Sequence, residues 1–122
     1  MKQQVFKPTN IGLKLVNPKL EMKSNEIYPL NFVLQNYDQK LSSSLTFRIS
    51  DSLNLIHWSD EKITLRPNEI LKRKIDLKPS SIPKNFQGAT DQITFYVLST
   101  SDNESENYII KTYETIHVSI FL

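Results

Sequence analysis

Cysteine is absent from this chain of 122 residues, and glycine occurs only at Gly12 and Gly88. Without thiols the chain can form no disulfide, no thiolate zinc site, no iron–sulfur cluster and no cysteine nucleophile. Because the two glycines lie far apart in the sequence, no glycine-rich loop is available to hold a phosphate group. These absences exclude thiol-dependent enzymes and nucleotide-binding proteins that rely on such a loop.

Charge of one sign and long hydrophobic runs are also lacking. Lys and Arg number 15 against 13 Asp and Glu, so the formal net charge is only +2. That excess is too small to indicate a nucleic-acid partner. No apolar run approaches the roughly 18 residues of a membrane-spanning helix, and residues 1–8 contain no apolar stretch of a secretory signal. We expect neither nucleic-acid binding nor membrane insertion by this chain, which would be cytoplasmic if complete and extracytoplasmic if excised from a larger protein.

Alternation of apolar and polar residues is abundant in this sequence. Leu30, Phe32 and Leu34 are separated by single residues, and the C-terminal stretch from Ile116 to Leu122 repeats the pattern. A period of two is typical of strands with one buried face. No long stretch shows the period of a helix. We predict an all-β chain with strands near 11–23, 27–36, 44–50, 53–58, 61–66, 70–78, 91–101 and 108–121.

Turn-forming residues separate these strands at regular intervals, for example at Asn17-Pro18 and from Pro79 to Thr90. Strands spaced by about 8–12 residues are typical of a β-sandwich. We therefore predict one immunoglobulin-like or fibronectin-III-like antiparallel β-sandwich of seven to eight strands over residues 1–122, with 1–10 as a loosely ordered lead-in. The inward rows predict a core that includes Leu30, Phe32, Leu34, Phe47, Ile75, Phe95 and Val118.

The turn near Pro67 predicts a register for the strands on either side of it. Proline presets the backbone at the second position of a β-turn, and Asn68 tolerates the third. A three-residue loop of Pro67, Asn68 and Glu69 would form a hairpin that places Leu65 opposite Leu71. The alternative two-residue loop would send the apolar row outward.

In the favoured register Lys62 lies directly across from Lys74, and Lys62, Arg66, Lys72 and Lys74 line one outward basic strip. The ordinary interpretation is a solvated edge that blocks aggregation between strands. The alternative is that the strip contacts an anionic surface, such as an acidic peptide or a partner protein. Arg73 falls on the inward row in this register, which is unfavourable unless it lies near the end of the sheet.

Two tyrosines offer a second candidate surface. Tyr96 and Tyr113 fall on the rows opposite to Phe95 and Ile116, so we expect both rings to point outward from neighbouring strands. Such a pair could form a platform for a sugar ring or a peptide. Scattered surface aromatics are also ordinary in soluble proteins.

Residues that could support catalysis or bind a metal form no recognisable motif. His57 and His117 lie far apart without a clustered third ligand, and we expect His117 to point outward. Asp102, Glu104 and Glu106 alternate as calcium ligands would, but the glycine and the distal Glu of an EF-hand loop are missing, which favours a solvated hairpin tip. The nucleophile motif G-x-S-x-G is absent. We expect no enzyme activity, no cofactor and no metal.

The strand that ends at Asn36 and the turn at Leu65-Arg66-Pro67 resemble immunoglobulin-like modules that bacteria append to larger proteins. Examples are the CARDB adhesion-related domain, the Ig-like domain accompanying some bacterial glycosidases, and the Ig-like tail of FixG-type cytochrome oxidase accessory proteins. The resemblance covers about residues 11–121, although Asn68-Glu69 replaces the usual glycine of that turn.

This resemblance implies a non-catalytic binding or accessory module that makes protein–protein interactions within a larger bacterial surface or membrane-associated assembly. Cytosolic adaptor ear domains, which capture short peptides, have the same size and strand count and are the alternative. Neither family supplies catalytic residues.

Overall fold

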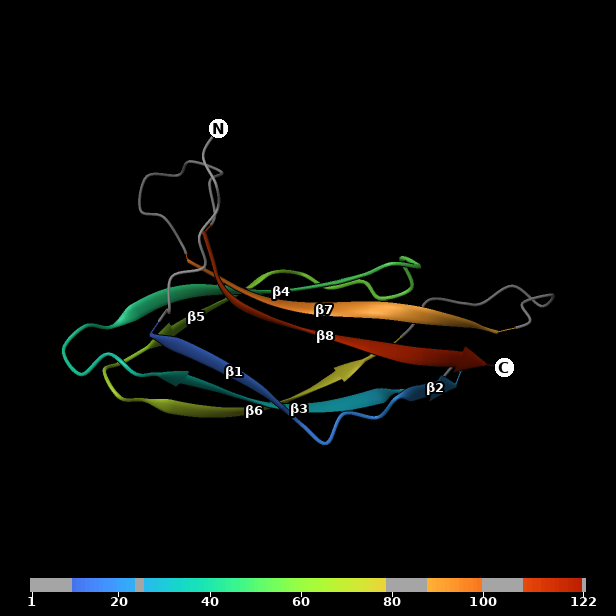
Figure 1. Cartoon of the computed structure of the whole chain (residues 1–122), viewed down its shortest axis with the longest axis horizontal. Coiled ribbons are helices and arrows are strands. Elements are labelled where there is room, and N and C mark those ends of the chain that lie inside the picture. The colour runs from blue at the N-terminus through green and yellow to red at the C-terminus, as the bar shows by residue number, and fades with distance from the viewer. Residues whose placement is uncertain (1–9, 24–25, 79–87, 100–108, 122) are drawn as a thin grey trace.

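The computed structural model describes residues 10–23, 26–78, 88–99 and 109–121. Its strands are β1 (Ile11–Val16), β2 (Glu21–Lys23), β3 (Tyr28–Asn36), β4 (Ser43–Asp51), β5 (Glu61–Leu65), β6 (Ile70–Leu77), β7 (Ala89–Ser99) and β8 (Ile109–Phe121). They form a three-stranded sheet in the order β1-β3-β6 and a five-stranded sheet in the order β2-β8-β7-β4-β5. Figure 1 shows these sheets as two layers. The predicted all-β sandwich is confirmed.

The core lies where the apolar rows of the two sheets meet. Phe32 of β3 stacks on Phe47 of β4 with their ring centroids 4.6 Å apart, and Phe95 of β7 lies beside Phe47. Stacked rings from opposite sheets hold the two layers together, since aromatic side chains bury large areas and favour offset contact. All of the side chains expected in the core are buried, namely Leu30, Phe32, Leu34, Phe47, Ile75, Phe95 and Val118.

The strand expected over residues 11–23 is two strands in different sheets. β1 pairs antiparallel with β3, whereas β2 pairs parallel with β8. Asn17 adopts a left-handed backbone conformation with φ of 47°, and Pro18 has no N–H to donate to a ladder. Because these two residues interrupt the strand, the chain leaves the first sheet and joins the second (Figure 1).

The predicted hairpin between β5 and β6 is wrong. Leu65 of β5 pairs with Ser43 of β4, and Leu71 of β6 pairs with Leu34 of β3. The connection therefore crosses from the five-stranded to the three-stranded sheet. The inward rows of both strands are nevertheless as expected, because Leu65 and Ile75 are buried from opposite sides of the core.

Hydrogen bonds to Asn36 account for this crossing. The turn itself matches the prediction, with the N–H of Glu69 donating to the carbonyl of Arg66 at 3.1 Å and a φ of 61° at Asn68. The buried Nδ2 of Asn36 donates to the carbonyls of Leu41 and Arg66 at 2.9 and 3.1 Å. The N–H of Asn36 also donates to the carbonyl of Glu69 at 2.9 Å. These bonds attach the turn to the end of β3, so the chain continues into β6 beside β3.

The prediction of a strand over residues 53–58 is also wrong, because this segment forms a turn and an irregular stretch. The carboxylate of Asp51 accepts the N–H groups of Leu55 and Ile56 at 2.7 and 3.1 Å. Asn54 has a φ of 55°, outside the range of a strand. A side chain thus satisfies backbone donors that would otherwise need a neighbouring strand.

The remaining predicted strands are confirmed with small differences at their ends. β7 begins at Ala89, two residues earlier than expected. Residues 1–9 of the lead-in expected over 1–10, most of the loop after Pro79 and the hairpin tip over 101–107 lie outside the described residues. Within the described ranges, no helix is long and apolar enough to span a membrane.

Candidate functional site

The outer face of the three-stranded sheet gathers lysines around apolar side chains. Strand register places Lys14 of β1 beside Val33 of β3, and Val33 beside Lys72 of β6. One pleat further along, Val16, Asn31 and Lys74 form a second row across the same strands. We call this surface the lysine face, defined by Lys14, Val16, Asn31, Val33, Lys72 and Lys74.

The lysine face is hollowed. A hollow of about 560 Å³ lies over these six residues and the adjoining positions Phe32 and Arg73. A second hollow of about 360 Å³ continues along the sheet to Tyr37 and Ile70, which are 56% and 55% exposed. Apolar surface at the centre and ammonium groups at the margin therefore occupy one continuous face.

The lysines of this face form no ion pair with any residue that the structure describes. All three lysine side chains are exposed. Because neighbouring strands lie about 4.8 Å apart, Lys14 and Lys72 are separated by about 10 Å across β3. The positive charges add over this short span, which favours contact with an anionic partner.

The predicted basic strip does not form one surface. Lys72 and Lys74 lie on the lysine face, but Lys62 lies on the outer side of the other sheet, opposite Thr46. Arg66 lies in the turn, with its Nε 3.7 Å from a carboxylate oxygen of Glu69. The proposed facing pair of Lys62 and Lys74 is thus wrong, because β5 and β6 belong to different sheets.

Lys14 and Val16 were not among the predicted site residues. Their alternation with Leu13 and Leu15 was the available sequence signal, since it sets them on the opposite face from those side chains. That signal does not reveal which strand lies beside β1.

Arg73 points inward as expected and is matched by a charge from the opposite sheet. Its Nη2 lies 2.6 Å from a carboxylate oxygen of Glu61, and both side chains are about one-third exposed. The pair joins β6 to β5 at the open side of the sandwich. Because Arg73 is partly exposed and paired with a carboxylate there, its charge is not buried without a partner on the inward row.

Tyr96 and Tyr113 lie side by side on the outer face of the five-stranded sheet, as predicted. The two residues pair directly across β7 and β8, with ring centroids 6.3 Å apart. Tyr113 is 46% exposed and Tyr96 is half-buried. Ligand binding by this tyrosine pair stays a prediction.

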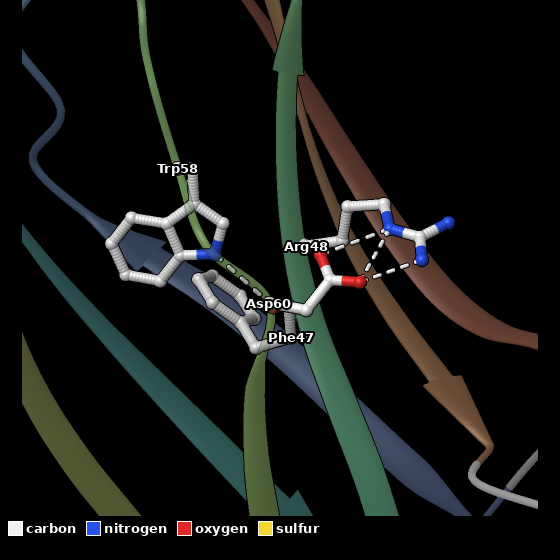
Figure 2. Close-up of polar contacts among 4 residues, drawn as sticks. All are labelled: Phe47, Arg48, Trp58 and Asp60. Atoms are coloured by element: carbon white, nitrogen blue, oxygen red, sulfur yellow. Dashed lines mark hydrogen bonds and ion pairs between the residues drawn. The ribbon is translucent and has the colours of Figure 1, made fainter.

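Arg48 of β4 pairs with Tyr96 of β7, and its side chain holds Asp60 at the edge of the same face. Its Nη2 and Nε donate to the carboxylate of Asp60 at 2.7 and 3.1 Å (Figure 2). These hydrogen bonds hold the pKa of Asp60 below its usual value. Figure 2 also shows the indole N–H of Trp58 donating to the carbonyl of Phe47, at 3.2 Å. Together the contacts fix residues 58–60 against β4.

A pair of carboxyl groups, the buried Asp91 and the half-buried Asp51, lies at one end of the core. Asp91 of β7 is completely buried, and its Oδ1 accepts the hydroxyl of Ser52 at 3.1 Å and the N–H of Leu53 at 3.0 Å. Among the described residues, no N–H or hydroxyl group donates to its Oδ2. Burial, followed by a hydrogen bond with Asp51, raises the pKa of Asp91 to about 6. Asp91 shares the inward row with Ile93, and this shared period was the sequence signal for its burial.

The described residues assemble no recognisable metal centre. His57 and His117 are both exposed, and the outward orientation expected for His117 is confirmed. Among the ranges that the structure describes, no group of three or more His, Cys, Asp or Glu side chains could hold an ion. Asp102, Glu104 and Glu106 lie outside those ranges.

No family model and no curated protein matches this chain. The structure is similar to a crystal structure of the CARDB domain of the PF1109 protein from Pyrococcus furiosus, described as a complex with di-metal ions. The sequences are 17% identical, the match covers 98% of this chain and 99% of that chain, and the TM-score is 0.62. This likeness shows that the chain has the fold of a CARDB-type immunoglobulin-like module.

Proposed function

We propose that this chain is a non-catalytic immunoglobulin-like module that binds another protein within a larger bacterial surface or membrane-associated assembly. The observation that supports this function best is the lysine face, where three exposed lysines border a hollow over Val16 and Val33. An apolar centre with a polar margin is the usual anatomy of a protein interface. The CARDB-type fold is compatible with an accessory role.

The location of the paired carboxyl groups supports a non-catalytic role. Asp51 and Asp91 form the carboxyl pair in the described chain whose geometry could suit acid–base chemistry. Asp91 is completely buried, and its partners are groups of the same protein. A substrate therefore has no direct access to it.

The tyrosine pair supports a second candidate, an adaptor ear that captures short peptides. Tyr96 and Tyr113 present adjoining rings on the five-stranded sheet, whereas the lysine face belongs to the three-stranded sheet. Lys62 and Arg66 remain candidates for such an interaction, although each lies away from the lysine face. A peptide ligand of this type would contact the five-stranded sheet.

Site-specific photo-crosslinking tests the proposed function. A photoreactive amino acid is placed at Val33 on the lysine face, and a matched control is placed at the exposed Thr64 of β5. The protein is produced in its native cells and irradiated. We expect a discrete crosslinked protein from position 33 and none from position 64.

A third probe at Tyr113 distinguishes the two candidates. Crosslinking at position 113 but not at position 33 would favour the adaptor ear. Absence of any crosslinked protein from all three positions would contradict a binding function on either sheet.

A further inference from the structure

We propose that the lysine face binds an acidic polypeptide segment in an extended conformation. This inference rests on the proposed function and specifies its partner class and binding surface. Three features of the face support it, namely the spacing of the lysines, the apolar surface between them and the position of one acidic residue.

The first feature is the spacing of Lys72 and Lys74. These residues point outward from the same strand two positions apart, so their Cα atoms lie about 7 Å apart along β6. An extended peptide repeats its side chains on one face at the same interval. Carboxylates at alternate positions of such a peptide would therefore match both lysines.

The second feature is the apolar surface beside the charges. Val33 lies between Lys14 and Lys72 in one row across the sheet, and Val16 lies in the adjoining row. The hollow of about 560 Å³ over these residues offers space for an apolar side chain of the segment. Lys14 is then positioned to meet a further carboxylate on the opposite side of that side chain.

The third feature is Asp76, the next outward position after Lys74 on β6, where it is exposed. A carboxylate opposite Asp76 would be repelled. The favoured segment thus has acidic residues opposite Lys72 and Lys74 and a neutral or basic residue two positions beyond. This charge pattern sets a direction as well as a composition for the ligand.

A polypeptide fits this face better than a highly charged polyanion does. The net charge of the whole chain is only +2, and strong binding to nucleic acid depends on many neutralised phosphates. The hollow includes Val16 and Val33 rather than aromatic rings on which bases could stack. Side chains of alternating acidic and apolar type complement both components of the surface.

The test uses a fluorescein-labelled glutamate–valine peptide, in which two glutamates flank a valine and a glutamine stands two positions after the second glutamate. Binding to the full chain is followed by fluorescence anisotropy at low salt. Matched peptides replace glutamate by glutamine or lysine. We expect the glutamate peptide to bind, and the other two to bind at least about tenfold more weakly. Added salt should weaken binding of the glutamate peptide, since the lysines are exposed.

Two charge-matched triple variants locate the interaction. Lys14→Gln, Lys72→Gln and Lys74→Gln together should weaken binding about tenfold and flatten its salt dependence. The control triple of Lys19→Gln, Lys23→Gln and Lys40→Gln, all exposed and outside the lysine face, removes the same charge and should change affinity by no more than about twofold. Equal weakening by both triples would overturn the inference, because only general charge would then be acting. Thermal melting verifies that both triples fold.

A third variant tests the apolar contact. Val33→Thr keeps the shape of the side chain. It should weaken binding of the glutamate–valine peptide several-fold and leave binding of polyglutamate unchanged. Tighter binding of polyphosphate or heparin than of the peptide, together with no effect of Val33→Thr, would overturn the choice of a polypeptide.

The outcomes also separate this inference from the proposed function. A protein crosslinked through position 33, without measurable binding of the glutamate–valine peptide, would overturn the acidic segment and leave the binding module intact. Absence of both crosslinking and peptide binding would overturn both.

Discussion

At the scale of single residues, Phe47 connects most parts of the core. Its ring stacks on Phe32 from the opposite sheet, lies 6.4 Å from Phe95 on β7, and meets the edge of Trp58 at 5.9 Å. Aromatic contacts of this kind contribute beyond the area they bury. The cluster therefore joins both sheets and the irregular segment after β4 at one point.

Phe95→Ala should lower the free energy of unfolding by about 3–5 kcal/mol, because it leaves a cavity in place of a ring that has no solvent exposure. Phe32→Ala should have a similar effect. Urea unfolding followed by circular dichroism measures both changes. Tyr113→Ala, on the exposed outer face, serves as the control and should cost far less. An unchanged unfolding midpoint for Phe95→Ala would show that the inward row is misassigned.

Asp91 should make the protein less stable as the pH rises from about 4 to above 6. Its folded pKa of about 6 exceeds the ordinary Asp value of 3.8, because burial and Asp51 favour the protonated form. In this window the folded state binds more protons than the unfolded state, so deprotonation costs stability, by about 1–3 kcal/mol. Asp91→Asn, which keeps a neutral donor towards Asp51, should remove this loss.

Urea titrations of the wild type and Asp91→Asn at pH 5 and pH 7.5 measure the effect. We expect the variant to gain stability relative to the wild type at the higher pH. Asp60→Asn is a useful control, since the pKa of Asp60 is shifted downward and not upward. A constant difference between wild type and Asp91→Asn at both pH values would contradict a raised pKa.

At the scale of elements, polar side chains direct the connections between strands. Asp51 accepts backbone N–H groups from the segment after β4, and Asn36 binds the turn between β5 and β6. Each side chain replaces hydrogen bonds that a further strand or a simple hairpin would have made. The paths of these two connections therefore depend on one residue each.

Asn36→Ala should destabilise the protein by about 2–4 kcal/mol, because it removes hydrogen bonds to the carbonyls of Leu41 and Arg66 within a buried site. The denaturation midpoint measures this change, and faster amide exchange near the turn would locate it. Asn31→Ala, an exposed site on the same strand, should change stability by less than about 0.5 kcal/mol. Equal effects of the two substitutions would contradict an anchoring role for Asn36.

At the scale of the whole molecule, the two sheets share one core, and a single domain over residues 1–122 stays a prediction. Trp58 contacts Phe47 in that core, so its fluorescence reports on packing, whereas far-ultraviolet circular dichroism reports on the strands. We expect the two signals to change together in urea, as in a two-state transition. Two separate transitions would contradict a single cooperative unit.

Alternation along the chain was sufficient to predict the all-β class, the buried row through Phe32 and Phe95, and the outward tyrosine pair. A period of two determines which face a side chain occupies, and Asn68 and Pro67 carry their turn preference locally. These properties depend on neighbours in the sequence, so they can be predicted without the tertiary structure.

Strand partners, by contrast, depended on contacts between distant segments. Periodicity alone allows the inward row of β6 to lie beside β5 or beside β3, and hydrogen bonds from Asn36 to the turn favour β3. Lys14 and Lys72 meet around Val33 only because β1 and β6 flank the same strand. Asp51 and Asp91 likewise come together only when β4 pairs with β7. The fold class therefore follows from the local sequence pattern. The lysine face and the carboxyl pair follow from long-range strand pairing, because periodicity does not determine which strands become neighbours.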